Sequence, residues 1–270
     1  MNKNTPYPAP GVRRLGLINT LGVWTLYKKE VRRFLKVVWQ TVAAPVITTL
    51  LFISVFMLAL GKDRAAVDNI PYHLFLVPGL IMMSVMTNAF ANTTSSIMVA
   101  KIQGTIVDVL MPPLGAGELT FAFAMGGVTR GVFVALVAGF LIYLVLPLGI
   151  AHWGVALYFV FASSLLMSLL GILGGIWAEK FDHMSAITNF IITPLAFLSG
   201  TFYSIERLPE PFQTLAGYNP FFYMIDGFRY GVLGRADGNV TIGAVVIAGI
   251  CVLLWFTVWW AFRTGWRIKS

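Results

Sequence analysis

Long apolar runs separated by short polar segments dominate the chain. A helix needs about 20 mostly apolar residues to cross the hydrocarbon core of a bilayer. Six segments approach this length, and we expect spans at residues 39–60, 74–99, 121–148, 153–178, 184–202 and 242–262. The fifth is the least apolar, because Ser185, Asn189 and Thr193 interrupt it. The pattern predicts an all-α integral membrane protein with six transmembrane helices.

The composition agrees with lipid as the solvent of these helices. Of the 270 residues, 58% are hydrophobic and 11% are charged, whereas soluble domains average about 25% charged residues. The single cysteine, Cys251, excludes a disulfide within the chain. The sequence has no GxxxxGK[ST], GxSxG or HExxH motif, which disfavours an ATPase, a serine hydrolase and a zinc protease. We therefore expect no enzyme activity and no cofactor or metal in this chain.

The net charge of +8 is distributed unevenly. Six spans place both termini on one side of the membrane, and that side carries 13 of the 19 Lys and Arg residues. The opposite side carries five, and Arg130 is placed near a helix end. Because basic residues concentrate in cytoplasmic loops, we expect both termini in the cytoplasm. Residues 1–38 then form a cytoplasmic arm, 39–262 the transmembrane domain and 263–270 a cytoplasmic tail, and the charge indicates topology rather than nucleic-acid binding.

Residues 15–38 have the pattern of an amphipathic helix. Apolar residues recur at intervals of three or four, and Lys28, Lys29, Arg32 and Arg33 lie on the other face. Such a helix is suited to the inner-leaflet interface, beside anionic headgroups. A charge cluster that only fixes topology is the alternative.

Two further segments are not simple spans. Residues 100–118 predict a short cytoplasmic helix that ends at Pro112-Pro113; it either inserts into the groove of a partner or rests on the membrane. Residues 203–240 combine prolines with many aromatic residues, which predicts re-entrant helices before the last span. Gly227 and Gly231 have the spacing that permits close helix packing there.

Polar side chains recur at helical spacing inside three spans. They are Thr41 and Thr48 in the first span, Ser84, Asn88 and Asn92 in the second, and Ser185, Asn189 and Thr193 in the fifth. In lipid they either form interhelical hydrogen bonds or line a translocation path. Small residues at Gly171/Gly175 and Ser164/Ser168 favour helix packing in the fourth span. The scarcity of charge in the spans disfavours ion-coupled transport.

Short motifs, taken in order, resemble those of one transporter family. The second span opens with Val77-Pro78-Gly79-Leu80 and continues as MSVMTNAFANTTSS at 83–96. The cytoplasmic segment then has Gly104-Thr105, Leu110 and Pro113, and a later run contains Ser199-Gly200, Phe202, Leu208-Pro209, Asn219-Pro220, Asp226, Arg229 and Leu233. The chain resembles the ABC-2 type permeases, the membrane subunits of bacterial ATP-binding-cassette exporters. Its likeness is to the short drug- or lipid-exporter type.

The resemblance implies a homodimer in the bacterial inner membrane, docked on two copies of an ATPase subunit that bind ATP and Mg²⁺. It implies export of an apolar or amphipathic substrate (drug, lipid or lipid-linked glycan) by alternating access. Membrane lipids are expected as further partners, and nucleic acid is not. The rival hypotheses are an ion-coupled transporter or channel without an ATPase partner, and a structural scaffold.

The resemblance also implies roles for individual segments. Residues 15–38 resemble the interface helix, and spans one, two and five resemble the walls of the translocation path. The coupling helix is expected to contain Lys101, Gly104, Thr105, Asp108, Leu110 and Pro113. The outer gate is expected to contain Phe202, Pro220, Phe221 and Arg229. One departure is Ala100-Lys101-Ile102-Gln103, which stands where relatives often carry Glu/Arg pairs.

Overall fold

The computed structural model describes residues 18–60, 70–146, 149–205 and 208–267. Within residues 41–60 it does not describe the side chains of Thr41, Val42, Pro45, Phe56, Met57, Ala59 and Leu60. The side chain of the predicted path residue Thr41 and residues 1–17 of the N-terminal arm therefore lie outside the described part.

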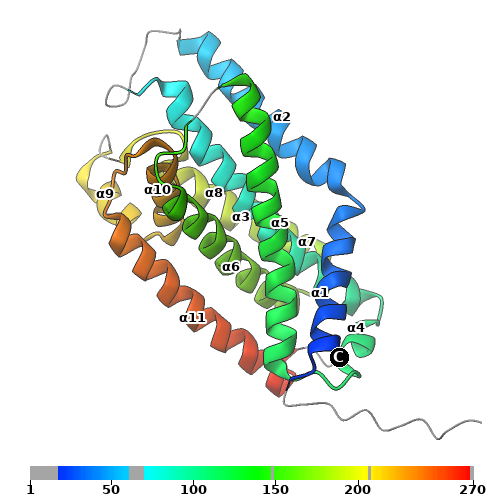
Figure 1. The fold of residues 1–270 in the computed structure, drawn as a ribbon. Coiled ribbons are helices and arrows are strands. Elements are labelled where there is room, and N and C mark those ends of the chain that lie inside the picture. The colour runs from blue at the N-terminus through cyan, green and yellow to red at the C-terminus, as the bar shows by residue number, and fades with distance from the viewer. Residues whose placement is uncertain (1–17, 61–69, 147–148, 206–207, 268–270) are drawn as a thin grey trace, which may run out of the picture.

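The described chain folds as a bundle of helices, as predicted (Figure 1). In chain order they are α1 (Thr20–Leu35), α2 (Val38–Leu60), α3 (Tyr72–Ile102), α4 (Ile106–Leu110), α5 (Ala116–Val145), α6 (Trp153–Trp177), α7 (Phe181–Ile187), η1 (Thr188–Ile192), α8 (Thr193–Ala196), η2 (Phe197–Thr201), α9 (Glu210–Tyr218), α10 (Pro220–Leu233) and α11 (Val240–Thr264). The two segments labelled η are single π-helical turns that interrupt the fifth predicted span.

Five helical segments of the described chain are long and apolar enough to cross a membrane. They are α3, α5, α6, the segment Phe181–Thr201 and α11. Helix α2 has 23 residues, of which Val46–Val55 form a shorter apolar stretch. It covers the first predicted span, so the sixth crossing remains a prediction. The short helices α9 and α10 occur where re-entrant helices are predicted.

The third predicted span begins earlier in the structure than the apolar pattern indicates. Helix α5 starts at Ala116, where the Glu118 carboxylate accepts a hydrogen bond from the Gly115 backbone N–H. It continues for 30 residues, so Arg130 lies in its middle. The expectation that Arg130 sits near a helix end is therefore wrong. The error arises because the uninterrupted apolar run begins after Arg130, at Val132, whereas the helix itself begins at Ala116.

Helices α3 and α6 approach closely through small residues and hydroxyl groups. A Cβ atom added to Gly171 would lie 2.6 Å from the Phe90 carbonyl oxygen of α3. Thr93 and Thr94 donate hydrogen bonds to the carbonyl oxygens of Ser168 and Gly171, at 2.9 and 3.0 Å. Small residues allow such contacts between helices in lipid, so the predicted packing role of Gly171 is confirmed.

Small residues also bring α6 against α5 and α10. Gly127 of α5 faces Ser168, and Gly131 faces Ser164. Helix α10 presents Gly227 and Gly231 to α6, and a Cβ atom on Gly231 would lie 2.6 Å from the backbone nitrogen of Ala156. The predicted close packing at Gly227 and Gly231 is thus confirmed, with α6 as the partner helix.

The variant Gly231→Ala tests this contact. Because the added Cβ atom meets backbone rather than a movable side chain, we expect overpacking to destabilise the protein by about 1–3 kcal/mol. The matched control is Gly249→Ala in α11, where the added Cβ atom has open space and alanine favours the helix. Thermal unfolding in detergent compares the two variants. Equal midpoints would contradict the close approach of α10 to α6.

Candidate functional site

The predicted coupling segment forms a short helix with an exposed apolar edge. Helix α3 ends at Ile102, and the chain turns at Gly104, whose φ is +70°. Helix α4 follows and packs inward through Ile106 and Val109, which are buried. Its other face presents Val107 and Met111, which are 54% and 77% exposed, together with the exposed Asp108. The segment therefore offers an apolar surface with one negative charge.

Lys101 joins this segment to the end of α6. Its ammonium group donates to the carbonyl oxygens of Ile176 and Ala178, at 2.6 and 2.9 Å. Cations stabilise the carbonyl groups that a helix leaves free at its C-terminus. Thr105, Leu110 and Pro113 complete the predicted segment: Thr105 and Pro113 are exposed, and Leu110 is half-buried. Lys101 thus fixes the start of the coupling segment rather than extending its exposed surface.

The start of α1 is fixed to the same end of the bundle. Asn19 caps α1 by accepting from the Gly22 N–H at 3.0 Å, and its own N–H donates to the Glu118 carboxylate. The Asn19 side-chain amide also donates to the Pro113 carbonyl oxygen at 3.3 Å. Helix α1 therefore contacts both the loop that follows α4 and the first turn of α5.

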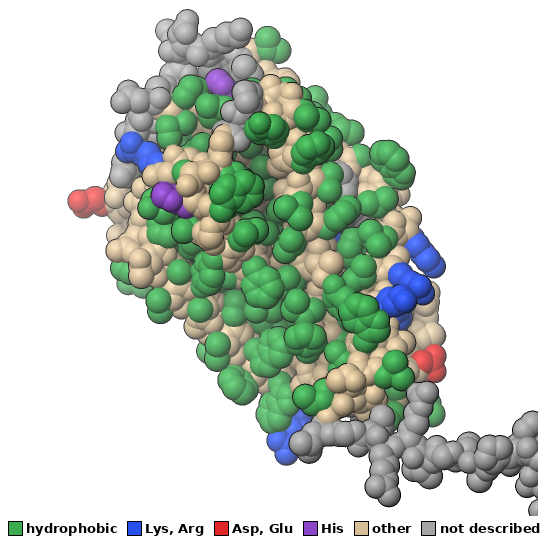
Figure 2. All heavy atoms as spheres, in the orientation of Figure 1, with side chains coloured by type: hydrophobic (Ala, Val, Ile, Leu, Met, Phe, Trp, Pro, Cys, Tyr) green, Lys and Arg blue, Asp and Glu red, His purple; other side chains and the backbone are tan. Residues whose placement is uncertain are grey.

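Three of the four predicted basic residues of α1 lie on an outer face. Lys28, Lys29 and Arg32 are exposed, and Figure 2 shows basic side chains gathered beside α1 on a face that is otherwise mainly hydrophobic. Arg33 turns inward instead, so its placement with the other three is wrong. The sequence pattern did not reveal that α1 has a third face, formed by Leu26, Glu30 and Phe34, which is buried against the bundle. Arg33 lies beside this buried face.

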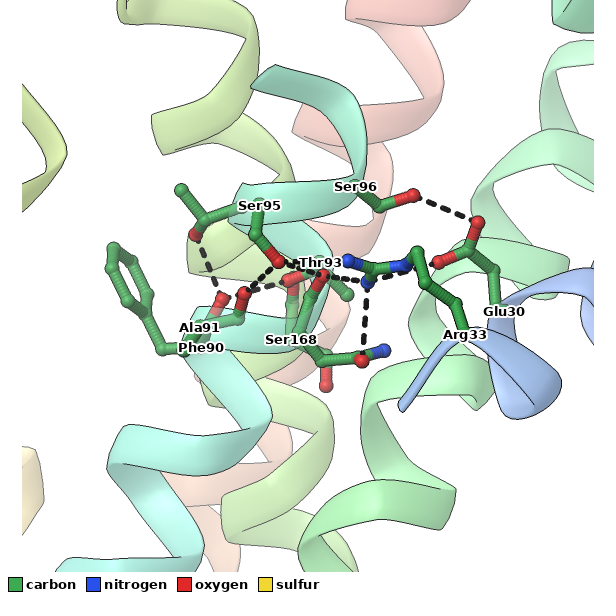
Figure 3. Close-up of polar contacts among 10 residues, drawn as sticks. Glu30, Arg33, Phe90, Ala91, Thr93, Ser95, Ser96 and Ser168 are labelled. Atoms are coloured by element: carbon green, nitrogen blue, oxygen red, sulfur yellow. Dashed lines mark hydrogen bonds and ion pairs between the residues drawn. The ribbon is translucent and has the colours of Figure 1, made fainter. Parts of the chain in front are cut away.

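Arg33 is the centre of a polar cluster between α1 and α3 (Figure 3). Its guanidinium group donates to the Ser95 hydroxyl at 2.9 Å and to both the backbone and the side-chain oxygen of Asn92. Glu30, which is fully buried, lies 3.3 Å from Arg33 and accepts from the Ser96 hydroxyl at 2.7 Å. Charged groups inside a helix bundle are expensive unless paired, so this cluster specifies how α1 docks.

The polar residues on one face of α3, the polar stripe Ser84, Asn88 and Asn92, differ in burial and in bonding partners. Asn92 is fully buried and holds Arg33. Asn88 is half-buried, and its amide oxygen accepts two hydrogen bonds from the Arg130 guanidinium, at 2.9 and 3.2 Å. Ser84 is half-buried and donates back to the Leu80 carbonyl oxygen of its own helix at 2.9 Å. Interhelical bonding thus involves both Asn92 and Asn88, while Ser84 and Asn88 retain exposed surface.

The remaining predicted path residues lie on α2 and on the interrupted fifth segment. Thr48 of α2 is exposed, as are Ser185 of α7 and Asn189 of η1, and Thr193 of α8 is half-buried. Exposed apolar residues such as Ile47 and Phe190 surround them. A polar group inside a membrane-spanning segment needs a polar neighbour or water. These residues therefore lie on surfaces where lipid tails would leave polar side chains without hydrogen-bond partners.

The predicted outer gate contains a buried charge network. Arg229 of α10 is 1% exposed, and it donates to the Gly200 carbonyl oxygen at 2.6 Å. Its guanidinium lies 3.9 Å from the Asp226 carboxylate and 4.0 Å from the centre of the Phe75 ring. Gly200 has φ +76°, a conformation that favours glycine. Arg229 therefore connects η2, α10 and α3.

Aromatic contacts surround this network. The ring of Phe202 lies 5.4 Å from that of Phe52 in α2, and its carbonyl oxygen accepts from the Tyr72 hydroxyl at 2.6 Å. Pro220 is the first residue of α10, and Phe221, which is buried, donates its N–H to the Asn219 side chain at 3.0 Å. All four predicted gate residues thus gather where α10 meets the end of the fifth segment.

A cavity of about 520 Å³ opens on another side of the bundle. It lies between α3, α5, α6 and α10, and its lining is almost entirely apolar, including Ile81, Leu136, Phe140, Leu157 and Phe228. None of the predicted path residues lines it. The cavity and the polar stripe are therefore separate features.

Comparison with known proteins identifies the family to which these elements belong. Residues 22–233 match the ABC-2 type transporter family, a range that includes most of α1, the predicted coupling segment and α10. The chain belongs to the ABC-2 type transporter family. ABC-2 permeases work with an ABC ATPase, so the family implies an ATPase partner for this chain.

Individual relatives of this ABC-2 permease cover most of its length. The chain is 35% identical to the inner membrane transport permease YadH of Escherichia coli K12, over 91% of this chain and 96% of the relative. It is 26% identical to nodulation protein J of Rhizobium leguminosarum bv. viciae, over 83% of this chain and 86% of the relative. Together with its apolar helices, these relatives make the chain a multi-pass inner membrane transport permease.

The variant Arg229→Met tests whether the buried network holds η2 against α10. Removing one partner of a buried ion pair costs about 3–5 kcal/mol, and the Gly200 carbonyl oxygen loses its donor as well. We therefore expect a clear fall in the thermal unfolding midpoint of the permease in detergent. Arg32→Met, at an exposed position on α1, is the control and should change the midpoint little. An equally small effect of both variants would argue against the network.

Proposed function

We propose that this ABC-2 permease is the membrane half of an exporter that moves an amphipathic substrate out of the cytoplasm by alternating access. The observation that carries the proposal is the exposed edge of α4 in a chain of this family. ATP binding on two partner subunits moves the two coupling helices, and the cavity of a permease homodimer opens outward. The membership of the family and the position of α4 between α3 and α5 support this arrangement.

The chemistry of α4 fits a docking element. Val107 and Met111 expose apolar side chains next to Asp108, and an exposed apolar edge bordered by charge is typical of a helix that inserts into a groove. Gly104 permits the sharp turn that separates α4 from α3. Lys101 holds the other side of the turn against α6. A displacement of α4 would therefore act directly on α3 and α6.

The polar residues of α2, α3 and the fifth segment support a path at the boundary between two permease copies. Thr48, Ser185 and Asn189 are exposed in one protomer, and a second copy would give them polar or hydrated surroundings. Ser84 and Asn88 extend the polar surface onto α3. The buried Arg229 network and Phe202 would close this path on the outer side.

A double variant, Gly104→Pro with Asp108→Arg, tests the coupling helix. Proline cannot adopt the positive φ of Gly104, and arginine reverses the exposed charge. We expect the permease to assemble in the membrane but to lose most of its stimulation of the partner ATPase, with Asp108→Arg alone giving a partial loss. The measurement is ATP hydrolysis by the reconstituted complex.

Glu210→Arg provides the matched control, because Glu210 is exposed at the start of α9, in the predicted non-cytoplasmic segment. It should leave the stimulation unchanged. Normal stimulation by the double variant would refute the coupling role. Transport that requires an ion gradient and continues without ATP would favour an ion-coupled carrier instead.

Cysteine cross-linking tests the homodimer. The chain has one cysteine, Cys251, so Cys251→Ala gives a cysteine-free background. We expect Asn189→Cys in this background to form a disulfide-linked dimer on mild oxidation, because the proposed path places both copies of the fifth segment near each other. Leu253→Cys, on the exposed face of α11, should remain monomeric on denaturing gels. Dimers from Leu253→Cys alone would reverse the proposed arrangement.

A further inference from the structure

Arg130 is a charged residue in the middle of a membrane helix, and no carboxylate pairs with it in the part of the chain that the structure describes. The ion pairs among the described residues are Glu30 with Arg33 and Asp226 with Arg229. The Arg130 guanidinium instead donates to an amide oxygen, that of Asn88. A cation without an anion is unusual inside a membrane bundle and by default marks a functional site.

Arg33 brings a second guanidinium group to the same stripe of α3. Arg130 binds Asn88 and Arg33 binds Asn92, and residues four apart lie on one face of a helix, about one turn from each other. The two guanidinium groups therefore reach neighbouring positions of the same α3 stripe, one from α5 and one from α1. Glu30 supplies one negative charge for the two cations, so the described cluster carries a net charge of +1.

The cluster is also short of hydrogen-bond acceptors. Arg33 Nε and Asn92 Nδ2 are buried without a partner in the described structure. The Arg33 side chain nevertheless remains 31% exposed, and Arg130 and Asn88 are half-buried. The site therefore has surplus donors, surplus positive charge and an opening to the surface of the protomer. Together these features fit a missing acceptor with negative charge.

We propose that Arg130 and Arg33 bind the oxyanion of an anionic amphiphile, such as a phosphate or carboxylate headgroup. Guanidinium groups bind such oxyanions through paired, charge-assisted hydrogen bonds. The inference rests on the proposed function, because Asn88 belongs to the proposed path, and it specifies the substrate class. The apolar residues around the path would then contact the tail, while the two arginines select a charged headgroup over a neutral one.

The test measures binding to the full-length permease in a neutral detergent, with no ATPase subunit. The probes are short-chain phosphatidic acid, short-chain phosphatidylcholine and inorganic phosphate, and the readout is the concentration dependence of the thermal unfolding midpoint. We expect phosphatidic acid to raise the midpoint and phosphatidylcholine to leave it unchanged. If inorganic phosphate raises the midpoint as much as phosphatidic acid does, the oxyanion alone is a sufficient ligand. If only phosphatidic acid raises the midpoint, the ligand must be an amphiphile.

The variants separate a site from general attraction to basic surfaces. Arg130→Gln should weaken phosphatidic acid binding by about tenfold, the loss expected for a charge-assisted hydrogen bond, and Arg130→Lys should retain part of it. Arg32→Gln removes an equal charge from the exposed face of α1 and should leave the binding intact. If Arg130→Gln does not fold, Arg33→Gln replaces it, with the same expected loss.

Three results would overturn the proposal: no stabilisation by phosphatidic acid or phosphate, equal stabilisation by phosphatidylcholine, or equal losses in Arg130→Gln and Arg32→Gln. Because this assay needs neither ATP nor a partner, its failure leaves the coupling role of α4 standing. Conversely, normal ATPase stimulation by the Gly104→Pro, Asp108→Arg variant would refute coupling without affecting the binding result.

Discussion

The close approach of α3 to α6 is the contact from which the other helices take their positions. Between helices in lipid the hydrophobic effect gives little attraction, so packing and hydrogen bonds must hold them together. Gly171 lets the backbone of α6 meet Phe90, and Thr93 and Thr94 bond across the gap. Gly127 and Gly231 then bring α5 and α10 onto α6. An added methyl group at these positions therefore affects several helices at once.

This packing makes α3 a continuous connection between the two ends of the bundle. Its 31 residues span about 46 Å at the α-helical rise of 1.5 Å per residue. Lys101, near its C-terminal end, donates to carbonyl oxygens at the end of α6. Near its other end, Phe75 lies under the Arg229 guanidinium and Gly79 touches the backbone of Thr201. Helix α3 thus connects the α4 end of the bundle directly to η2 and α10 at the other end.

Hydropathy was enough to predict the helical class, the positions of most spans and the short helix after α3, because lipid imposes length and composition on a helix. The spacing of Gly227 and Gly231 also predicted a true contact. Hydropathy did not predict side-chain contacts between segments that are distant in the sequence. Arg33 looked like part of a basic surface because its partners, Asn92 and Ser95, lie some 60 residues away in sequence. The π-helical turns at 188–192 and 197–201 have no hydropathy signal.

The docking of α1 explains why one arginine and one glutamate, Arg33 and Glu30, lie inside the bundle of a membrane protein with so few charges. Asn19 fixes one end of α1 to Glu118 and Pro113, and Arg33 fixes the other end to α3. A helix tied at both ends is joined to α3 and to the loop after α4, while Lys28 and Lys29 on its other face are exposed. One arginine and Glu30 suffice for that docking. Arg130 is not part of it, since its bonds join α5 to Asn88 of α3, and this separation from the docking contacts is why we assign Arg130 to the proposed anion site.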